Sequence, residues 1–146
     1  MPLASGTTDV VLVCVKAWQV SEAATAMLPM LRDTTSVVPL ANGIEAADQL
    51  TAVVGRKRVL GGLCRILSYV TGPGRIRHAG VAPQVEFGEW DGRCTPRVEA
   101  LSAAFATATG VAASVPTDIE IALWSKFLFI APLSGCLLYT SDAADE

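Results

Sequence analysis

DVVLVCV, residues 9–15, is the stretch that decides the fold, because after Asp9 every position is apolar and most are β-branched. A strand that is apolar on both faces is typical of the buried interior of a parallel sheet. The segments that follow alternate between helical and strand composition: helix 18–32, strand 36–41, helix 44–54 and strand 58–63. This order predicts right-handed βαβ crossovers and an α/β fold with a parallel sheet.

The pattern changes after this third strand, where short extended segments are separated by turn signals. The strongest signal is Thr71-Gly72-Pro73-Gly74, which predicts an antiparallel hairpin. The extended segments are 64–70, 75–79 and 83–88. A helix over 96–109 and a last strand over 111–115 complete this part of the chain.

One more helix is predicted after Pro116. Thr117 and Glu120 have the spacing of a capping box, so we expect this helix to span about 118–131. Pro116 is therefore the candidate domain junction. It divides the chain into a first domain, a second domain and a tail: 1–116, 117–135 and 136–146.

Composition narrows the class of protein. The chain has 146 residues, of which 51% are hydrophobic and 17% charged, so it can bury the core of one ordinary domain. Its formal charge of −3 offers no basic excess for phosphate contacts, which argues against nucleic-acid binding. The longest apolar stretch, 127–139, falls short of the roughly 20 residues that a membrane span needs.

Cysteine and histidine usage narrows the kind of site. The four cysteines lie far apart and form no C-x-x-C pair, so we expect a reduced, cytoplasmic compartment rather than a disulfide framework. His78 is the sole histidine, which excludes a site built from several histidines, and we predict no metal. The N-terminus has no basic segment followed by an apolar one, as a secretory signal requires.

Two polar residues follow predicted strands at the edge where α/β folds bind ligands. Lys16 ends the first strand and could reach a phosphate or a ribose, or it could simply extend into solvent. Asn42 ends the second strand and offers both a donor and an acceptor to a ligand. Asn42-Gly43 is also a common turn pair, so a purely structural role stays open.

Lys126 is the most informative single residue. It falls on the apolar stripe of the last helix, whose helical spacing is formed by Ile119, Ala122, Leu123, Lys126 and Ile130. A lysine held against an apolar surface loses hydration, and its pKa falls toward the range that a general acid needs. The alternative is a lysine that extends its ammonium to the surface.

Together these motifs resemble the ketopantoate reductase family. VCVKAWQV at 13–20 resembles the family's V-K-A/T-x-Q signature, and LANGIE at 40–45 is similar to its L-x-N-G motif. RVLGGL at 58–63, with TGPGRIRHAG at 71–80, resembles the family's glycine pair and following hairpin. DIEIALWSKFLFIAPLSG at 118–135 is similar to its I-x-x-x-x-W-x-K motif. Four motifs in this order are more specific than any one of them.

The resemblance implies a fold and a reaction. The fold is a partial Rossmann-like, doubly wound domain with an antiparallel hairpin extension, followed by the first helix of an all-α C-terminal domain. The reaction is reduction of a 2-oxoacid, 2-dehydropantoate, by NADPH to pantoate. Lys126 and Asn42 would be the catalytic residues. Lys126 would donate the proton and contact substrate, Asn42 would contact both substrate and cofactor, and Lys16 would contact NADPH. A homodimer is an assembly that the resemblance allows for the full-length protein.

The sequence also departs from the family pattern. No G-x-G-x-x-G occurs, and the resemblance stops at Gly135, so we expect an internal fragment that is inactive by itself. The tail 136–146 does not resemble the family. Ile130 stands where the family often has Asn, four residues after the catalytic lysine, which leaves the substrate open.

Two other interpretations compete with this one. A 3-hydroxyacid or glycerol-3-phosphate dehydrogenase of the same superfamily would share the fold, although the K-A-W-Q and W-x-K motifs argue against it. A non-catalytic interaction module would use exposed apolar surface to bind a partner.

Overall fold

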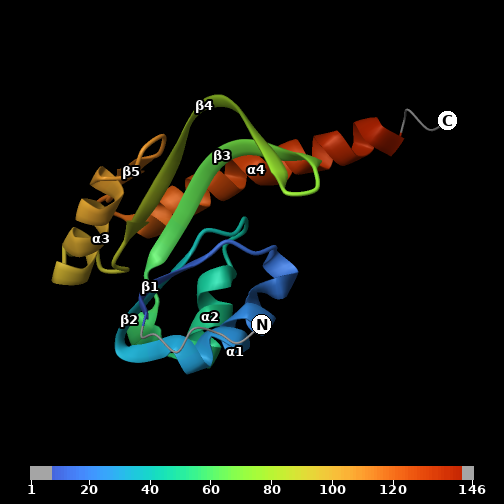
Figure 1. The fold of residues 1–146 in the computed structure, drawn as a ribbon. Helices are drawn as coiled ribbons and strands as arrows, with labels where there is room; N and C mark the ends of the chain where they lie inside the picture. Colours follow the sequence, from blue (N-terminus) through green and yellow to red (C-terminus); the bar gives the residue numbers. More distant parts are fainter. Residues whose placement is uncertain (1–7, 143–146) are drawn as a thin grey trace.

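The computed structural model describes the backbone of residues 8–142 and the side chains of residues 8–136. It is a mixed α/β fold with two sheets (Figure 1). Its strands and helices are β1 Thr8–Val13, α1 Val20–Met27, β2 Leu31–Pro39, α2 Ala46–Val54, β3 Gly61–Gly72, β4 Arg75–Gly88, α3 Pro96–Ala106, β5 Ala112–Ser114 and α4 Ile119–Asp142. Short 3₁₀ turns lie at Ala17–Gln19, Leu28–Met30 and Arg56–Arg58.

The first half is a small parallel unit. β1 pairs in parallel with β2, and a single parallel bridge joins Val37 of β2 to Val59. The backbone N–H of Leu60 also donates to the carbonyl of Val37 at 3.0 Å. Helices α1 and α2 pack on these strands in one apolar cluster that includes Val20 and Leu50. The carboxyl ends of β1 and β2 therefore lie at one edge, as the βαβ order predicts.

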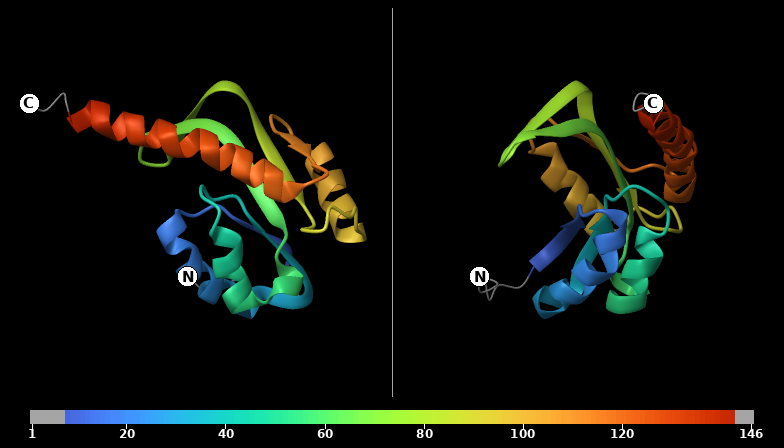
Figure 2. Two further views of the ribbon diagram at one scale, coloured as in Figure 1. Left: turned by 180° about the vertical axis from the view of Figure 1, so that it is seen from behind. Right: turned by 90° about the vertical axis from the view of Figure 1, so that its right-hand side faces the viewer.

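The second half is built on a long antiparallel hairpin, which we call the arm. β3 and β4 pair along most of their length, and β5 adds to β4 in parallel after the crossover through α3. Phe87 of β4 faces α3, where its ring stacks on Phe105 at 5.6 Å. α4 packs against the other face of the hairpin, so the two helices flank it (Figure 2).

Two adjacent glycines let the layers approach closely. A Cβ atom on Gly61 would lie 2.6 Å from Ile119 Cγ1, at the start of α4. A Cβ atom on Gly62 would lie 2.5 Å from Val38 Cγ1 and 2.8 Å from the carbonyl oxygen of Pro39. Real Cβ atoms do not come so near other heavy atoms, so this glycine pair sets how α4 and β2 sit against β3.

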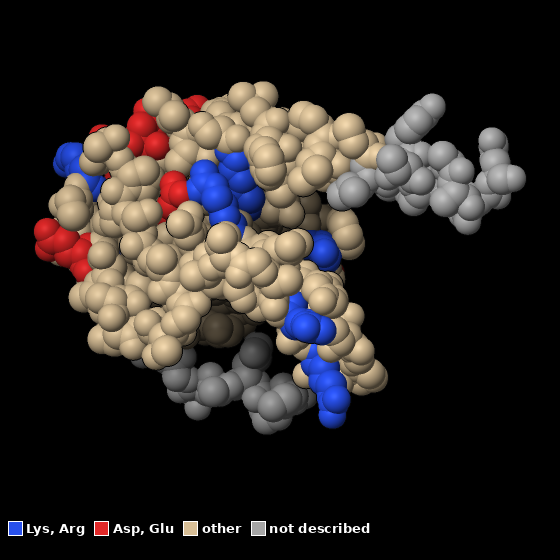
Figure 3. Space-filling view, turned by 90° about the horizontal axis from the view of Figure 1, so that it is seen from above, with Lys and Arg blue, Asp and Glu red and all other residues tan. Residues whose placement is uncertain are grey.

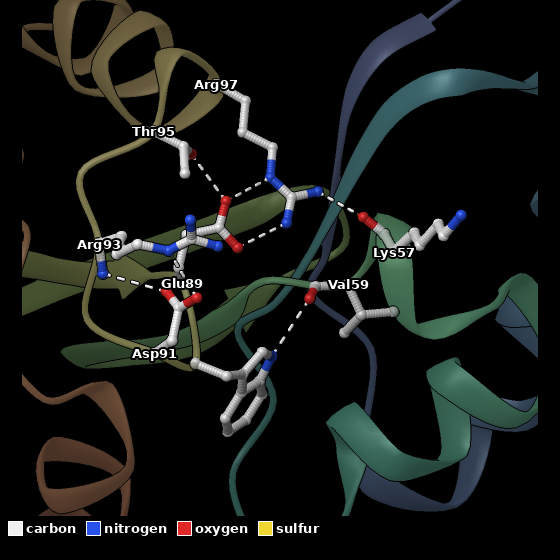
Figure 4. Close-up of polar contacts among 8 residues, drawn as sticks. Lys57, Val59, Glu89, Asp91, Arg93, Thr95 and Arg97 are labelled. Carbon is white, nitrogen blue, oxygen red and sulfur yellow. Dashed lines mark hydrogen bonds and ion pairs between the residues drawn. The ribbon is translucent and has the colours of Figure 1, made fainter.

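The half-buried carboxylate of Glu89, just after β4, connects the end of this strand to α3 (Figure 4). Glu89 accepts two hydrogen bonds from the Arg97 guanidinium, at 2.7 and 2.6 Å, and one from Thr95 Oγ1 at 2.7 Å. Arg97 also donates to the carbonyl of Lys57 at 2.6 Å. These bonds, led by those from Arg97, hold the pKa of Glu89 below its usual value. The pair thereby links α3 to the turn before β3.

The helix α1 is shorter than predicted, and β2 begins earlier. The predicted helix 18–32 is replaced by α1 between two 3₁₀ turns, and Pro29, which has no N–H to donate, lies in the second turn, Leu28–Met30. β2 begins at Leu31 rather than at residue 36. The side chain of Thr35 donates to the carbonyl of Thr8 at 2.6 Å and accepts from the N–H of Arg32, which holds this early part of β2 beside β1.

The hairpin region also differs in detail from the prediction. Residues 58–63 contribute only one parallel bridge, because the chain then leaves β2 and pairs with β4 instead. The extended segments 75–79 and 83–88 join into the single strand β4. Its register shifts opposite Ile66, where Gly80 adopts a φ of 79°.

Helix α4 is capped and bounded differently from the prediction. Its first turn is capped by Asp118, whose Oδ1 accepts from the N–H of Ile121 at 3.0 Å, rather than by Thr117. The helix continues through Pro132 and into the predicted tail as far as Asp142. The rest of that tail, residues 143–146, lies outside the described residues, as do residues 1–7.

The arm and α4 leave much apolar surface open. Seen from above, this end of the molecule carries few charges over a wide area (Figure 3). The exposed large apolar side chains on the arm are Ile66, Leu67, Tyr69, Val70, Ile76 and Val81, and those on α4 are Ile121, Trp124, Leu128, Phe129 and Leu133. The α4 window Ile119–Cys136 has the length and composition of a membrane span, by those two criteria alone.

Candidate active site

A pocket of about 250 Å³ opens at the carboxyl edge of β1 and β2. Its lining is the segment 42–46, together with Ala17, Gln49 and Phe127. Ala17 follows β1, the segment 42–46 follows β2, and Phe127 comes from α4. This is the edge where parallel α/β sheets bind ligands, so the pocket is the candidate active site.

Asn42 lines this pocket directly. It is exposed in the loop between β2 and α2, and the next residue, Gly43, has a φ of 97°. That backbone conformation suits glycine and lets the loop turn sharply into α2. Within the described part of the chain, the Asn42 amide makes no hydrogen bond to another residue, so it is available to a ligand in the pocket.

Lys16 stands at the same edge but does not line the pocket. Its backbone N–H donates to Gln19 Oε1 at 3.3 Å, and its carbonyl accepts from the N–H of Gln19 at 2.8 Å. This closed turn places Ala17 in the pocket wall and leaves the Lys16 side chain exposed. The ammonium can therefore meet an anionic group that approaches from solvent.

Lys126 is buried, with only 9% of its surface exposed. The predicted stripe is confirmed as the packed side of α4: Ile119 is buried with Lys126, and Ala122, Leu123 and Ile130 are half-buried. The Nζ atom is enclosed and has no hydrogen-bond partner among the residues that the structure describes. An ammonium group without a partner is costly to bury, so such a residue calls for an explanation beyond packing.

The surroundings of Lys126 come from β3. Burial lowers the pKa of its ammonium; Cys64 opposes this shift, and the Arg65 cation adds to it. Arg65 is itself ion-paired with Glu86 of β4. Burial raises the pKa of the Cys64 thiol, and Lys126 opposes that shift. The lysine side chain therefore lies against β3, near Cys64 and Arg65 at the base of the hairpin.

The structure brings some predicted site residues together and separates others. Phe127, the neighbour of Lys126, lines the pocket with Asn42. Burial raises the pKa of the Cys14 thiol, two residues before Lys16, and Cys64, which also acts on Lys126, raises it further. Ala17 and Phe127, the chain neighbours of Lys16 and Lys126, line the same pocket as Asn42. The Lys126 ammonium itself does not line the pocket in this conformation.

Asn42 is the one pocket residue that was predicted as a site residue; the others, among them Ile44, Gln49 and Phe127, were not. Gln49 follows Ala46, another pocket residue, by three residues in α2, so the two lie on the same face of that helix. Phe127 has no such signal, because the sequence shows it only as one apolar residue among several in the same helix. No group of three His, Cys, Asp or Glu side chains that suits a metal ion occurs within the described part of the chain.

Comparisons with known proteins agree with this geometry. The model of the family described as Ketopantoate reductase PanE/ApbA matches residues 3–92. The uncharacterized oxidoreductase YkpB of Bacillus subtilis is 36% identical over 133 residues, which cover 90% of this chain and 43% of that protein.

Two solved structures extend the comparison. The 2-dehydropantoate 2-reductase from Geobacter metallireducens GS-15 is 32% identical with a TM-score of 0.74, over 83% of this chain and 40% of that one. The enzyme of the same name from Porphyromonas gingivalis W83 is 26% identical with a TM-score of 0.82, over 93% of this chain and 47% of that one.

The chain spans less than half the length of these relatives. The predicted Rossmann-like α/β fold with a following helix is confirmed by both structures. The family model covers more than half of the chain, and the V-K-A-W-Q and N-G motifs lie within the matched residues. The chain therefore belongs to the Ketopantoate reductase PanE/ApbA family.

Proposed function

We propose that this chain supplies the proton donor and part of the ligand site of an NADPH-dependent 2-oxoacid reductase, which converts 2-dehydropantoate to pantoate. The observation that carries the proposal is the buried Lys126 Nζ, which has no hydrogen-bond partner among the described residues, while the next residue, Phe127, lines the pocket with Asn42. Burial lowers the pKa of Lys126, so its ammonium gives up a proton more readily than that of an exposed lysine, as a general acid must.

Each site residue has a role that its chemistry supports. Lys126 would donate a proton to the carbonyl oxygen as that oxygen gains negative charge, and its cation would stabilise the developing alkoxide. Asn42 would orient the substrate and the cofactor through its amide. Lys16 would attract an anionic part of the cofactor from its exposed position.

The residues at this edge fit part of a nicotinamide nucleotide. An exposed ammonium and an exposed amide follow adjacent parallel strands, with a small pocket next to them, which matches the polar and planar groups of such a cofactor. When bound, NADPH supplies the hydride that reduces the ketone. The sequence holds no G-x-G-x-x-G for the pyrophosphate, so we propose that this chain alone binds NADPH weakly and is inactive.

The proposal also covers the cellular location, the domain division and the assembly of the protein. We propose a cytoplasmic location, since Cys14, Cys64 and Cys94 are free thiols. We also propose that the chain divides into two domains near Pro116 and that α4 is the first helix of a helical domain. Homodimer formation is proposed for the longer protein, which would use apolar surface of the kind that α4 exposes.

The reductase proposal is tested in a protein that contains this chain and oxidises NADPH with 2-dehydropantoate. Lys126→Ala is expected to lower kcat by about 10²–10⁴, the usual contribution of a general acid, with little change in the KM for NADPH. NADPH absorbance measures the rate. Lys57→Ala is the matched control, because Lys57 is exposed in a turn away from the pocket. Unchanged turnover for Lys126→Ala would exclude the proton-donor role.

A further inference from the structure

One face of the hairpin is directed toward α4. A Cβ atom on Gly61 of β3 would lie 2.6 Å from Ile119 Cγ1, and a Cβ atom on Gly88 of β4 would lie 3.9 Å from Ile119 Cβ. The two glycines are opposite each other in the register of the hairpin. Because side chains alternate between the two faces of a strand, Arg65 and Glu86 lie on the same face as these glycines. Both charged side chains are therefore directed toward α4.

Lys126 reaches this face at the level of the two charged side chains. It follows Ile119 by seven residues, which is about 10 Å along the helix. From the glycine contact, β3 rises about 13 Å to Arg65, and β4 covers about 7 Å to Glu86. α4 packs against both strands, and the Arg65 cation contributes to the lowered pKa of Lys126. Three charged groups are thus gathered between α4 and the base of the hairpin.

Two of these three groups are paired with each other. Arg65 forms an ion pair with Glu86, whereas Lys126 Nζ is enclosed without a hydrogen-bond partner among the described residues. Glu86 is the one acidic residue in β3 and β4, and only 17% of its side chain is exposed. Arginine is well suited to such a half-buried pair, because its planar guanidinium matches a carboxylate. The carboxylate that the hairpin offers to α4 is therefore bound by the arginine and not by the lysine.

The other titratable groups around Lys126 do not replace this carboxylate. Burial raises the pKa of the Cys64 thiol in β3, so the thiol is neutral at pH 7. Glu45, in the loop after β2, lines the pocket with Phe127, but it is exposed to water, which screens its charge. The charge balance at Lys126 consequently depends on Arg65 and Glu86.

We infer that Arg65 is a positioning residue for the proton donor: by holding the Glu86 carboxylate, it keeps the Lys126 ammonium without an acidic partner. The inference rests on the proposed role of Lys126 as that donor. A lysine that pairs with a carboxylate holds its proton more strongly, because the negative charge favours the ammonium form. Such a lysine is a weaker acid and delivers its proton to a substrate less readily.

The experiment measures the proton affinity of Lys126 in this chain by an NMR titration of ¹³C-labelled lysine side chains. The chain has three lysines, and the exposed Lys16 and Lys57 serve as internal references. Arg65→Met is expected to raise the proton affinity of Lys126 at least about tenfold, the usual effect of an opposite charge close by. Arg65→Lys, which keeps a cation for Glu86, is expected to stay close to the wild type.

A double variant separates the carboxylate from the charge of the arginine itself. If Arg65 acts by holding Glu86, Arg65→Met combined with Glu86→Gln is expected to lose most of the rise. A rise that persists in the double variant, or that is absent in folded Arg65→Met, overturns the positioning role. Arg65→Gln takes the place of Arg65→Met if the latter fails to fold by circular dichroism. Arg93→Met is the matched control, because it breaks the exposed pair with Asp91 and is expected to leave Lys126 unchanged.

The positioning role and the proposed reductase function can fail separately. In a protein that contains this chain and reduces 2-dehydropantoate, Arg65→Met is expected to move the alkaline limb of the pH profile of kcat to higher pH. If Lys126→Ala lowers turnover but Arg65→Met leaves the proton affinity of Lys126 unchanged, only the positioning role fails. If Lys126→Ala leaves turnover unchanged, the reductase role of the lysine fails, even where the titration shows that Arg65 controls its charge.

Discussion

A single buried charge dominates the chemistry of this chain. Lys126 is enclosed between α4 and the base of the hairpin, and its Nζ has no hydrogen-bond partner in the described residues. Burying a polar group in this way costs about 1–3 kcal/mol of stability. A residue that serves only packing would be replaced by an apolar one at no loss, so this cost is consistent with a functional role.

Replacing Lys126 with methionine is therefore expected to stabilise the chain. Lys126→Met keeps the length of the side chain and removes the charge, so the free energy of unfolding at pH 7 is expected to rise by about 1–3 kcal/mol. Denaturant melts followed by circular dichroism give this value. Lys57→Met, at an exposed lysine, is expected to change it by less than about 0.5 kcal/mol.

The gain from Lys126→Met depends on pH with a definite sign. The folded-state pKa of Lys126 is lowered, so between that pKa and its ordinary value of 10.5 the unfolded chain binds more protons. Wild-type stability consequently rises with pH across this interval. The difference between Lys126→Met and the wild type is expected to narrow as the pH approaches 10.5. A difference that grows with pH would contradict the burial of a charged ammonium.

At the scale of elements, one close contact sets the position of α4. Gly61 of β3 lies against Ile119, the first residue of the helix, and no larger residue fits there. Since Lys126 and Phe127 follow Ile119 by two helical turns, a shift at this contact carries both residues with it. Stability and site geometry are thus coupled through a glycine that takes no part in the chemistry.

Gly61→Ala is expected to lower the free energy of unfolding by about 1–3 kcal/mol, the usual cost of overpacking a tight site. Its added Cβ would lie 2.6 Å from Ile119 Cγ1. Gly72→Ala in the same strand is the control and is expected to be nearly neutral, because no heavy atom lies within 4 Å of its added Cβ. Ile119→Ala is expected to relieve part of the strain, so the double variant loses less than the sum of the two single ones. Additive losses would show that the contact is not direct.

At the scale of the whole molecule, the notable feature is how much apolar surface stays open. The arm residues 66–85 include Arg75 and Arg77 but no Asp or Glu, and apolar side chains are exposed along the arm and α4. Apolar patches of this extent usually mark an interface or a liability to aggregate. The chain spans less than half of its relatives' length.

The isolated chain is accordingly expected to self-associate at micromolar concentration, as measured by sedimentation velocity. Replacing the exposed pair Leu128 and Phe129 with lysine is expected to shift the distribution toward monomer, since it removes apolar area and adds charge. Ala100→Lys, at an exposed position of α3, is the control for added charge. A wild-type chain that is monomeric at all concentrations would exclude association through this surface.

Local patterns predicted most of the elements and the packed position of Lys126. The apolar run 9–15 marks β1, and helical spacing places Lys126 on the packed side of α4. Pairing was less predictable, because the same extended segment, 58–63, suits a parallel neighbour or a hairpin partner equally well. The end of a helix was least predictable: Thr117 and Asp118 are both good caps, and only backbone geometry selects Asp118.

The sequence by itself determined the α/β class, the order of its elements, the motifs of the family and the apolar stripe that holds Lys126. Each of these depends on residue type and spacing along the chain. Only the tertiary structure decided that β3 and β4 pair into a long hairpin and that Phe127 rather than Lys126 lines the pocket at Asn42. It also decided that α4 packs against Gly61, where a larger residue would clash with Ile119. These features depend on contacts between residues that are distant in the sequence. Packing sets the distances and directions of such contacts, and the periodicity of the sequence does not reveal them.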